Sequence, residues 1–267
     1  MYYHNADNLP LTNEKFRMTL KSFSRNNRMY LGSKRVFDIV VSLLVILFLL
    51  SWLIPVLALL IRLDSKGPVF FIQKRVGAGG KLFNCLKLRS MVTNAHANTK
   101  QAQKNDPRIT ALGSFLRKAC LDELPQFFNV FMGDMSIVGP RPHMIQDCND
   151  FTQLVPQYNS RHLVKPGITG IAQIKGCRGE TKSIYDVMHR YQWDMFYIRN
   201  INFFLDLKII YKTFLQTVSD TMKQEEEKKA ITTKTTVVTK EKTRSDFQDH
   251  LVEVLVPDFK ASAYLRK

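Results

Sequence analysis

The sequence is short of acidic residues and lacks paired cysteines. It has 23 Asp and Glu against 39 Lys and Arg, a formal net charge of +16 over 267 residues. Cys85, Cys120, Cys148 and Cys177 lie about thirty residues apart with no CxxC pair, which argues against a zinc site or a disulfide framework. A hydrophobic content of 45% excludes a wholly disordered basic chain. The charge therefore predicts an anionic partner: nucleic acid, a membrane surface or a phosphorylated small molecule.

Charge is also absent from one long segment, because residues 39–61 contain no Asp, Glu, Lys or Arg. At roughly 1.5 Å per residue, a helix of this length reaches across a hydrocarbon core of about 30 Å. A secretory signal peptide is disfavoured, since the run begins almost forty residues into the chain and does not lead into a small-residue cleavage site. We therefore predict a retained membrane segment.

Two topologies fit this segment. Pro55, four residues after Ser51, removes a backbone hydrogen bond and would kink or break the helix. Basic residues, which prefer the cytoplasmic side, flank both ends. They are Lys21, Arg25, Arg28, Lys34 and Arg35 before the run, and Arg62, Lys66, Lys74, Arg75 and Lys81 after it. A re-entrant hairpin satisfies both ends, but on the residues alone we favour a single-pass helix with a proline kink, which would place the first 35 residues outside.

Composition divides the chain into four regions. Residues 1–33 are polar and basic with little periodicity, which predicts a surface arm, and residues 34–66 form the membrane unit. Residues 67–220 form the body, in which no internal repeat is visible. Residues 221–267 form a tail of different composition, in which residues 251–257 fit either one alternating strand or an apolar patch in a disordered extension.

The start of the body predicts a β-hairpin. Residues 68–89 contain two β-rich runs joined by a turn with Gly77, Gly79 and Gly80. A phosphate-binding glycine loop is disfavoured, because such loops lead from a strand into a helix. The charges of the hairpin fit either a phosphate-binding face or a membrane-surface patch. They are Lys74, Arg75, Lys81, Lys87 and Arg89.

An acidic pair lies further along the body. The spacing predicts a helix over 109–118 and the first turn of another at Pro125. Asp122 and Glu123 then stand at a helix entry, where carboxylates cap unpaired N–H groups, and on residue chemistry alone capping is the simpler interpretation. The alternative is a nucleophile or metal ligand in chemistry on a phosphate. The basic neighbours that favour this alternative are Arg108, Arg117 and Lys118.

Arg141 stands between Pro140 and Pro142, which predicts a stiff loop that fixes its guanidinium. A fixed guanidinium suits bidentate contact with a phosphate, and an idle arginine on a surface turn fits equally well. Further glycine-rich loops with basic residues lie at 165–170 and 176–181. Each of these blocks is weak by itself.

In this order, however, the blocks resemble the bacterial sugar transferase family, the polyprenyl-phosphate hexose-1-phosphate transferases. The resemblance covers roughly residues 33–218. Its residues are Lys34-Arg-Val-Phe-Asp, Gly67-Pro-Val-Phe-Phe, Lys87-Leu-Arg-Ser-Met, Asp106-Pro-Arg-Ile-Thr, Leu121-Asp-Glu-Leu-Pro-Gln, Gly133-Asp-Met-Ser-Ile-Val-Gly-Pro-Arg-Pro and Lys165-Pro-Gly-Ile-Thr-Gly. Residues 178–181 and 206–210 look like the branch typified by undecaprenyl-phosphate glucose and galactose phosphotransferases.

The resemblance implies an α+β, mostly helical monotopic membrane protein with a small β-hairpin and a cytosolic helical catalytic body. Its re-entrant helix, broken at Ser51 and Pro55, would enter and leave the cytoplasmic leaflet, which reverses the preference for a single-pass helix. The family transfers a hexose 1-phosphate from a UDP-hexose to undecaprenyl phosphate and releases UMP, the first membrane step of exopolysaccharide, capsule or O-antigen assembly. Glucose and galactose both stay open as the hexose.

The resemblance also assigns the site. Asp122 would attack the sugar-bearing phosphorus, and Glu123 would assist by metal positioning or proton handling, with Mg²⁺ held by this pair and the substrate phosphates. Arg117 matches a family arginine that meets a substrate phosphate. A wider anion-binding set comprises Arg75, Lys87, Arg89, Arg108 and Arg141.

Three departures from the family pattern are present. Leu88 stands where Phe is common, and Ala119-Cys120 stands where Ser or Thr-Ser is common. Ile54 rather than Ser precedes Pro55. The larger members carry an N-terminal membrane domain that this sequence lacks, so we expect the catalytic unit alone.

The resemblance further implies a protein of the bacterial inner membrane with its catalytic domain facing the cytoplasm, and it leaves a homodimer open. A catalytically silent scaffold for glycosyltransferases would keep the fold but dispense with the acidic pair, whereas Asp122 and Glu123 are both present. Nucleic acid is the least favoured partner, because no nucleic-acid-binding module is recognisable.

Overall fold

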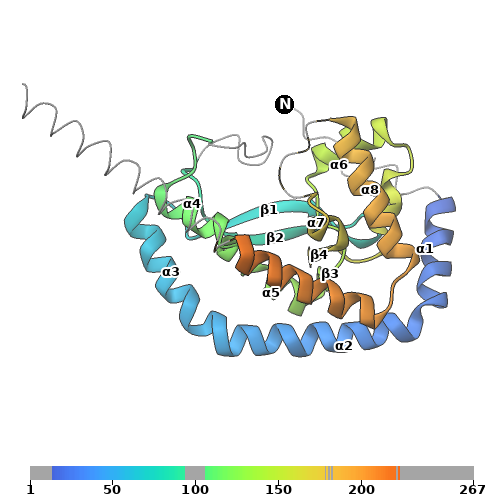
Figure 1. The fold of residues 1–267 in the computed structure, drawn as a ribbon, viewed down its shortest axis with the longest axis horizontal. Helices are drawn as coiled ribbons and strands as arrows, with labels where there is room; N and C mark the ends of the chain where they lie inside the picture. Colours follow the sequence, from blue (N-terminus) through green and yellow to red (C-terminus); the bar gives the residue numbers. More distant parts are fainter. Residues whose placement is uncertain are drawn as a thin grey trace, which may run out of the picture. The chain divides into compact units, whose positions relative to one another are not determined.

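The chain divides into two compact units, Met1–Thr217 and Val218–Lys267. The computed structural model describes residues 14–93, 106–177, 179, 181, 183–220 and 222. The first unit is mostly helical and contains one antiparallel hairpin (Figure 1), which confirms the predicted mixture of elements. The strand or apolar patch predicted at 251–257 lies outside the described residues.

The predicted N-terminal arm contains a helix, α1 (Glu14–Asn26), while residues 1–13 lie outside the described part of the chain. Phe16 and Phe23 of α1 pack against two buried clusters of the body. Phe16, Leu20 and Phe23 stand four and three residues apart, which is a helical period, so the expectation of little periodicity was wrong for this stretch.

A long bent helix follows α1. It consists of α2 (Arg28–Val45), the π-helical turn η3 (Ile46–Leu50) and α3 (Ser51–Asp64), which follow one another without a gap (Figure 1). The helix is long and apolar enough to cross a membrane, and only 17% of its most apolar stretch is buried. Length and composition therefore agree with the predicted membrane segment.

The predicted helix break takes the form of a bend between α2 and α3 (Figure 1). Ser51 begins α3 and its Oγ donates a hydrogen bond to the Leu47 carbonyl at 2.6 Å. Pro55 lies inside α3, where it can donate no backbone hydrogen bond. A π-helical turn and a proline one turn apart are recognised causes of helix kinks.

Both ends of this helix contact the same unit. In α2, Lys34 Nζ lies 2.6 Å from Asp206 Oδ2, and Asp38 Oδ1 accepts a hydrogen bond from the Ile137 N–H at 3.0 Å. In α3, Leu57 and Ile61 form a buried cluster with Leu88 and Leu116 of the body. Because of the bend, both α2 and α3 contact the body.

The predicted hairpin is confirmed. β1 (Phe70–Val76) and β2 (Leu82–Leu88) are antiparallel, with Phe70 opposite Leu88 and Val76 opposite Leu82. The connecting turn contains η4 (Ala78–Gly80), in which Gly79 has a φ of 62° and Gly80 a φ of 78°. Side chains rarely adopt this left-handed conformation, so the glycines serve the turn.

The predicted helix over 109–118 is α4 (Ala111–Lys118), and Thr110 Oγ1 caps it by accepting a hydrogen bond from the Gly113 N–H at 2.9 Å. The short turn η5 (Leu121–Glu123) follows, and then α5 (Gln126–Met132), which begins directly after Pro125 as predicted. Cys120 has a φ of 56° and is the non-glycine residue with positive φ among those described. Its left-handed backbone ends α4 and turns the chain into η5.

The remaining elements of the body are β3 (Ser136–Val138), α6 (Ile145–Leu154), η6 (Tyr158–Leu163), β4 (Gly167–Thr169), α7 (Ile171–Ile174) and α8 (Ile184–Arg199), and residues 203–217 are helical. β3 and β4 form a short parallel pair that the sequence did not predict, because three-residue strands give no alternating pattern. The main core contains Val130, Met135, Val138, Tyr197 and Ile209. This core holds α5, which directly follows the turn of the acidic pair, against β3.

Candidate active site

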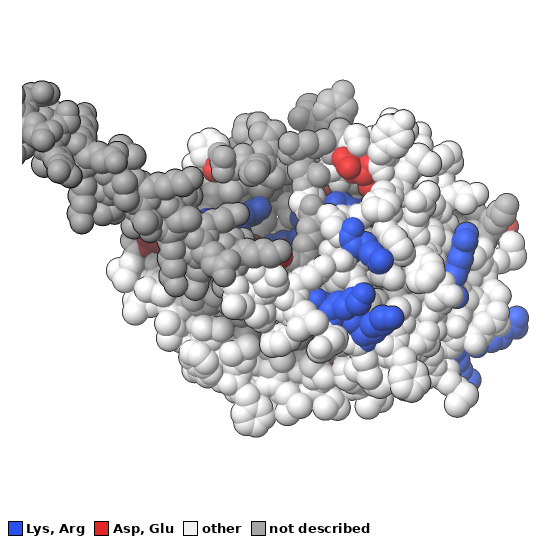
Figure 2. Space-filling model, viewed as in Figure 1, with Lys and Arg blue, Asp and Glu red and all other residues white. Residues whose placement is uncertain are grey.

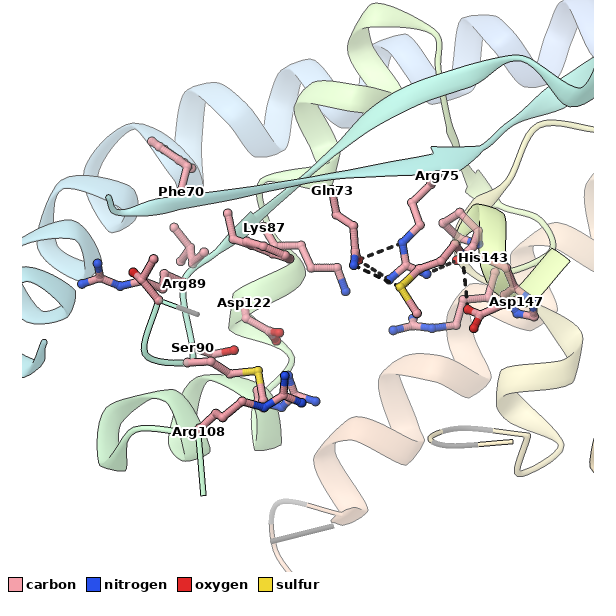
Figure 3. A pocket seen from close by; sticks show the side chains of 18 of the residues that line it. Phe70, Gln73, Arg75, Lys87, Arg89, Ser90, Arg108, Asp122, His143 and Asp147 are labelled. Atoms are coloured by element: carbon pink, nitrogen blue, oxygen red, sulfur yellow. Dashed lines mark hydrogen bonds between the residues drawn. The ribbon is translucent and has the colours of Figure 1, made fainter. Parts of the chain in front are cut away.

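Asp122 occupies the turn η5, between the end of α4 and the start of α5. Asp122 is 7% exposed, and its carboxylate points into a pocket that contains residues of β1, β2 and α4 (Figure 3). No described residue donates a hydrogen bond to this carboxylate, so the capping interpretation is wrong for Asp122. A buried carboxylate of this kind is available to a ligand.

The Glu123 carboxylate is held by two cations. Lys87 Nζ donates to Oε1 at 2.6 Å, and Arg141 donates through Nη2 to Oε1 at 2.6 Å and through Nη1 to Oε2 at 3.0 Å. The two Arg141 contacts form a bidentate pair, the strongest arrangement between these groups. Both carboxylate oxygens are engaged, so capping is wrong for Glu123 as well, and the Arg141 guanidinium is held by this carboxylate.

The two carboxyl groups differ in pKa because their surroundings differ. Burial and the adjacent Glu123 charge raise the pKa of Asp122 to about 6. Burial also opposes ionisation of Glu123, but Arg141 and Lys87 outweigh it and hold the pKa of Glu123 well below its usual range. Glu123 is therefore a fixed negative charge, whereas Asp122 changes its charge near neutral pH.

All six cations that the sequence nominated line the pocket of Asp122. They are Arg75, Lys87, Arg89, Arg108, Arg117 and Arg141. Figure 3 shows Arg89 on one side of Asp122, Arg75 with His143 and Asp147 on the other, and Arg108 below. Residues from separate parts of the sequence thus come together around one carboxylate.

Of these cations, Arg89 lies beside the end of α3. Arg89 Nη2 donates to the Ile61 carbonyl at 3.1 Å and to the Ser65 carbonyl at 2.5 Å, while its Nε and Nη1 are buried without a hydrogen-bond partner. Arg108 Nη2 lies 2.7 Å from Asp106 Oδ2. Exposed Arg117 acts on Asp122 electrostatically. The pocket therefore begins where the apolar helix ends.

Sequence reasoning missed several polar residues of the pocket, among them Gln73, His143, Asp147 and Arg190. His143 directly follows the Pro140–Pro142 block, so its place beside Arg141 could have nominated it. Arg190 lies within α8, where no local pattern distinguishes it from a solvated helix residue. Within the described residues, no group of three or more His, Cys, Asp or Glu side chains could hold a metal ion.

A pocket that gathers seven cations around a buried carboxylate, at the end of an exposed apolar helix, is suited to phosphorylated ligands beside an apolar surface. The chain belongs to the bacterial sugar transferase family, whose sequence profile matches residues 29–220. This match confirms the resemblance that the motifs indicated.

Curated relatives agree with the family. A UDP-glucose:undecaprenyl-phosphate glucose-1-phosphate transferase of Klebsiella pneumoniae is 50% identical over 181 residues, which cover 67% of this chain and 39% of the relative. The exopolysaccharide production protein PSS of Rhizobium leguminosarum bv. phaseoli is 44% identical over 185 residues, which cover 67% of this chain and 92% of that protein. An undecaprenyl-phosphate galactose phosphotransferase of Salmonella typhimurium is 41% identical over 196 residues. This chain matches about two fifths of the length of the Klebsiella and Salmonella proteins.

Proposed function

We propose that the protein is a phosphoglycosyl transferase that moves a hexose 1-phosphate from a UDP-sugar to undecaprenyl phosphate and releases UMP. The observation that carries this proposal is the buried Asp122 carboxylate, without a hydrogen-bond partner among the described residues, in a pocket lined by seven cations. Relatives named as glucose-1-phosphate and galactose phosphotransferases support the reaction class. Exopolysaccharide, capsule or O-antigen assembly would use the product.

In the proposed reaction, an Asp122 oxygen attacks the sugar-bearing phosphorus and the bond from that phosphorus to the UMP oxygen breaks. An oxygen of undecaprenyl phosphate then attacks the same phosphorus, and the bond to Asp122 breaks. A pKa of about 6 leaves Asp122 mostly ionised at neutral pH, as a nucleophile requires. Phosphoryl transfer depends on positioning and charge neutralisation, which the surrounding guanidinium groups supply.

Glu123 is best suited to positioning. Its two oxygens accept three hydrogen bonds from Lys87 and Arg141, which fixes both cations beside Asp122. Its low pKa argues against proton transfer at neutral pH. Of the two roles that the family resemblance implied, the geometry favours placement of charged groups.

Mg²⁺ is proposed as the cofactor. Mg²⁺ is usually held by one or two carboxylates together with substrate phosphates, and the unengaged carboxylate of Asp122 fits that arrangement. Glu123 was also expected as a ligand, but both of its oxygens are occupied by Lys87 and Arg141, so in this geometry Asp122 is the protein ligand. When bound, the ion would neutralise charge on the donor diphosphate.

We further propose that the bent helix is re-entrant and seats the protein in the cytoplasmic leaflet of the bacterial inner membrane. A spanning helix would separate its two ends by the thickness of a bilayer, whereas both ends of this helix pack against one unit. Large apolar side chains of the helix are exposed, among them Phe48, Trp52, Leu59 and Leu63. Figure 2 shows no charged side chain over η3, at the lower edge of the view. A homodimer stays a prediction.

The test is release of UMP from UDP-glucose and UDP-galactose by the full chain in detergent with undecaprenyl phosphate. We expect release by wild type and none above background by Asp122→Asn, with Arg199→Gln, an exposed change on α8, as the active control. Without undecaprenyl phosphate, wild type should release about one UMP per enzyme and retain the labelled sugar phosphate. No release from any UDP-hexose would refute the proposal and favour the silent scaffold. Release that persists in EDTA would refute the magnesium assignment.

A further inference from the structure

Two arginines at one end of the pocket have no acidic hydrogen-bond partner. Arg75 lies on β1 and Arg190 on α8, and both line the pocket of Asp122. Nearby guanidinium groups are paired differently: Arg141 binds Glu123 and Arg161 binds Asp194. A guanidinium removed from water without a countercharge is costly, so the pair at this end needs an explanation.

Arg75 is held by neutral acceptors. Its Nε donates to Gln73 Oε1 at 3.0 Å, its Nη2 donates to the same oxygen, and its Nη1 donates to the Pro142 carbonyl at 3.0 Å. Asp147 and Glu123 act on Arg75 electrostatically, but neither is hydrogen-bonded to it. These contacts fix the direction of the guanidinium and leave its charge without an ion pair.

Arg190 is buried and is also held by neutral groups. Its Nη1 lies 3.2 Å from His143 Nε2, and its Nη2 donates to the Cys177 carbonyl at 3.1 Å and the Gly179 carbonyl at 3.2 Å. Its Nε is buried and has no hydrogen-bond partner. The nearby acid Asp194 is already bound by Arg161 through two hydrogen bonds. Arg190 thus keeps an unused donor and an unpaired charge at the pocket.

His143 cannot balance these charges. Its Nε2 faces the Arg190 donor and so accepts, which puts the ring proton on Nδ1, 2.8 Å from the Tyr158 hydroxyl oxygen. Burial and the surrounding arginines hold the pKa of His143 well below its usual range, so the ring is neutral. Among the described residues, this end of the pocket therefore holds two guanidinium groups and no group that forms an ion pair with either.

We propose that Arg75 and Arg190 bind the nucleotide-side phosphate of the donor, the one that leaves within UMP. This inference rests on the proposed function, in which the sugar-bearing phosphate lies beside Asp122 and the second phosphate lies one bridging oxygen away. The opposite side of the pocket borders the apolar helix through Arg89, so the polar nucleotide is better placed at the Arg75 side (Figure 3).

This placement has a chemical consequence. When the bond between the sugar-bearing phosphorus and the bridging oxygen breaks, that oxygen keeps the electron pair and negative charge grows on the departing UMP phosphate. Arg75 and Arg190 are fixed before the reaction by their neutral contacts and would stabilise that charge. They would promote the first half-reaction, which forms the phospho-sugar intermediate.

The test compares UMP with uridine, which lacks the phosphate, by isothermal titration of the full chain in detergent. Arg75→Gln and Arg190→Lys each remove donors from the subsite, and Arg199→Gln on the exposed side of α8 is the matched control. We expect wild type to bind UMP more tightly than uridine, and each variant to reduce that preference roughly tenfold or more, with uridine affinity unchanged. Arg199→Gln should keep the wild-type preference.

The outcomes separate the possibilities. An unchanged UMP-to-uridine preference in Arg75→Gln and Arg190→Lys would overturn the inference, and so would a loss in Arg89→Gln without a loss in these two. Equal loss of affinity for uridine and UMP would also overturn it, because that result would mean that Arg190 only supports the conformation of the loop at Cys177. The two proposals can also fail separately. If the variants lose the UMP preference but the wild-type protein releases no UMP from UDP-hexoses, the subsite is supported and the proposed function is refuted.

Discussion

The ionised carboxylate of Asp122 should destabilise the folded protein at neutral pH, and Asp122→Asn should remove that effect. Asp122 is 7% exposed and has no hydrogen-bond donor among the described residues to compensate for lost hydration. Folding raises the pKa of Asp122 from 3.8 to about 6. The folded state therefore binds the Asp122 proton more tightly than the unfolded state does.

The sign and size follow from this difference. Well below pH 3.8 the carboxyl group is protonated in both states and has no effect on stability. Between pH 3.8 and about 6 stability falls as pH rises, and above about 6 the full penalty is present. At about 1.36 kcal/mol per pKa unit, the penalty is roughly 3 kcal/mol, of which about 1 kcal/mol is already present at pH 4.5.

The assay compares unfolding temperatures of wild type and Asp122→Asn at pH 4.5 and pH 8, in one detergent with EDTA. The advantage of the variant should grow by about 2 kcal/mol between these pH values, which corresponds to roughly 4–8 °C for a unit of this size. Asp150→Asn, which removes an exposed carboxylate on α6, is the matched control. A constant difference at both pH values, or a wild type that is the more stable protein at pH 8, would refute the reasoning.

Three further predictions concern the acidic pair, the base of the helix and its topology. Glu123→Gln leaves two cations without their countercharge and should slow UMP release by about 10- to 100-fold. The pH midpoint of activity should move down, because Glu123 no longer raises the pKa of Asp122. A wild-type rate of UMP release would contradict the positioning role of Glu123. Lys34→Met leaves buried Asp206 without its cation and should cost about 3–5 kcal/mol in thermal unfolding, and a cost under about 1 kcal/mol would contradict this role. Cysteines replacing exposed Met29 and Lys66, in a background without the exposed native cysteines, should both react from the cytoplasmic side, whereas reaction from opposite sides would mean a spanning helix.

Local elements with a strong pattern could be predicted from the sequence. The hairpin has β-rich runs on both sides of Gly79 and Gly80. These glycines adopt a left-handed backbone, as a tight turn between two strands requires. The helix over 111–118 carries its own N-cap in Thr110. In each case a few neighbouring residues determine the conformation, so periodicity and turn chemistry were enough.

The ion-pair pattern of the site could not be predicted in the same way. Glu123 forms ion pairs with Lys87, 36 residues earlier, and with Arg141, 18 residues later. Three segments of the chain must therefore pack together before these ion pairs can form. The capping interpretation failed for Glu123 because cations that are distant in the sequence, rather than the backbone of α5, bind its carboxylate. Arg190 reaches His143 across 47 residues and leaves no local signal. The motifs predicted which charged residues belong to the site, but only the packed structure shows which of them form ion pairs.

The same packing explains why the basic charge and the apolar run belong together. Arg89 lines the pocket and donates to the carbonyls of Ile61, in the last turn of α3, and of Ser65, directly after α3. Under the re-entrant topology proposed above, the depth of the apolar helix in the membrane would therefore determine the height of the pocket above the membrane. Under the proposed function the acceptor carries its phosphate at the membrane surface, and the pocket must open at that height to receive it. A change that tilts α3, such as replacement of Pro55, should thus impair transfer to the lipid more than release of UMP in the first half-reaction.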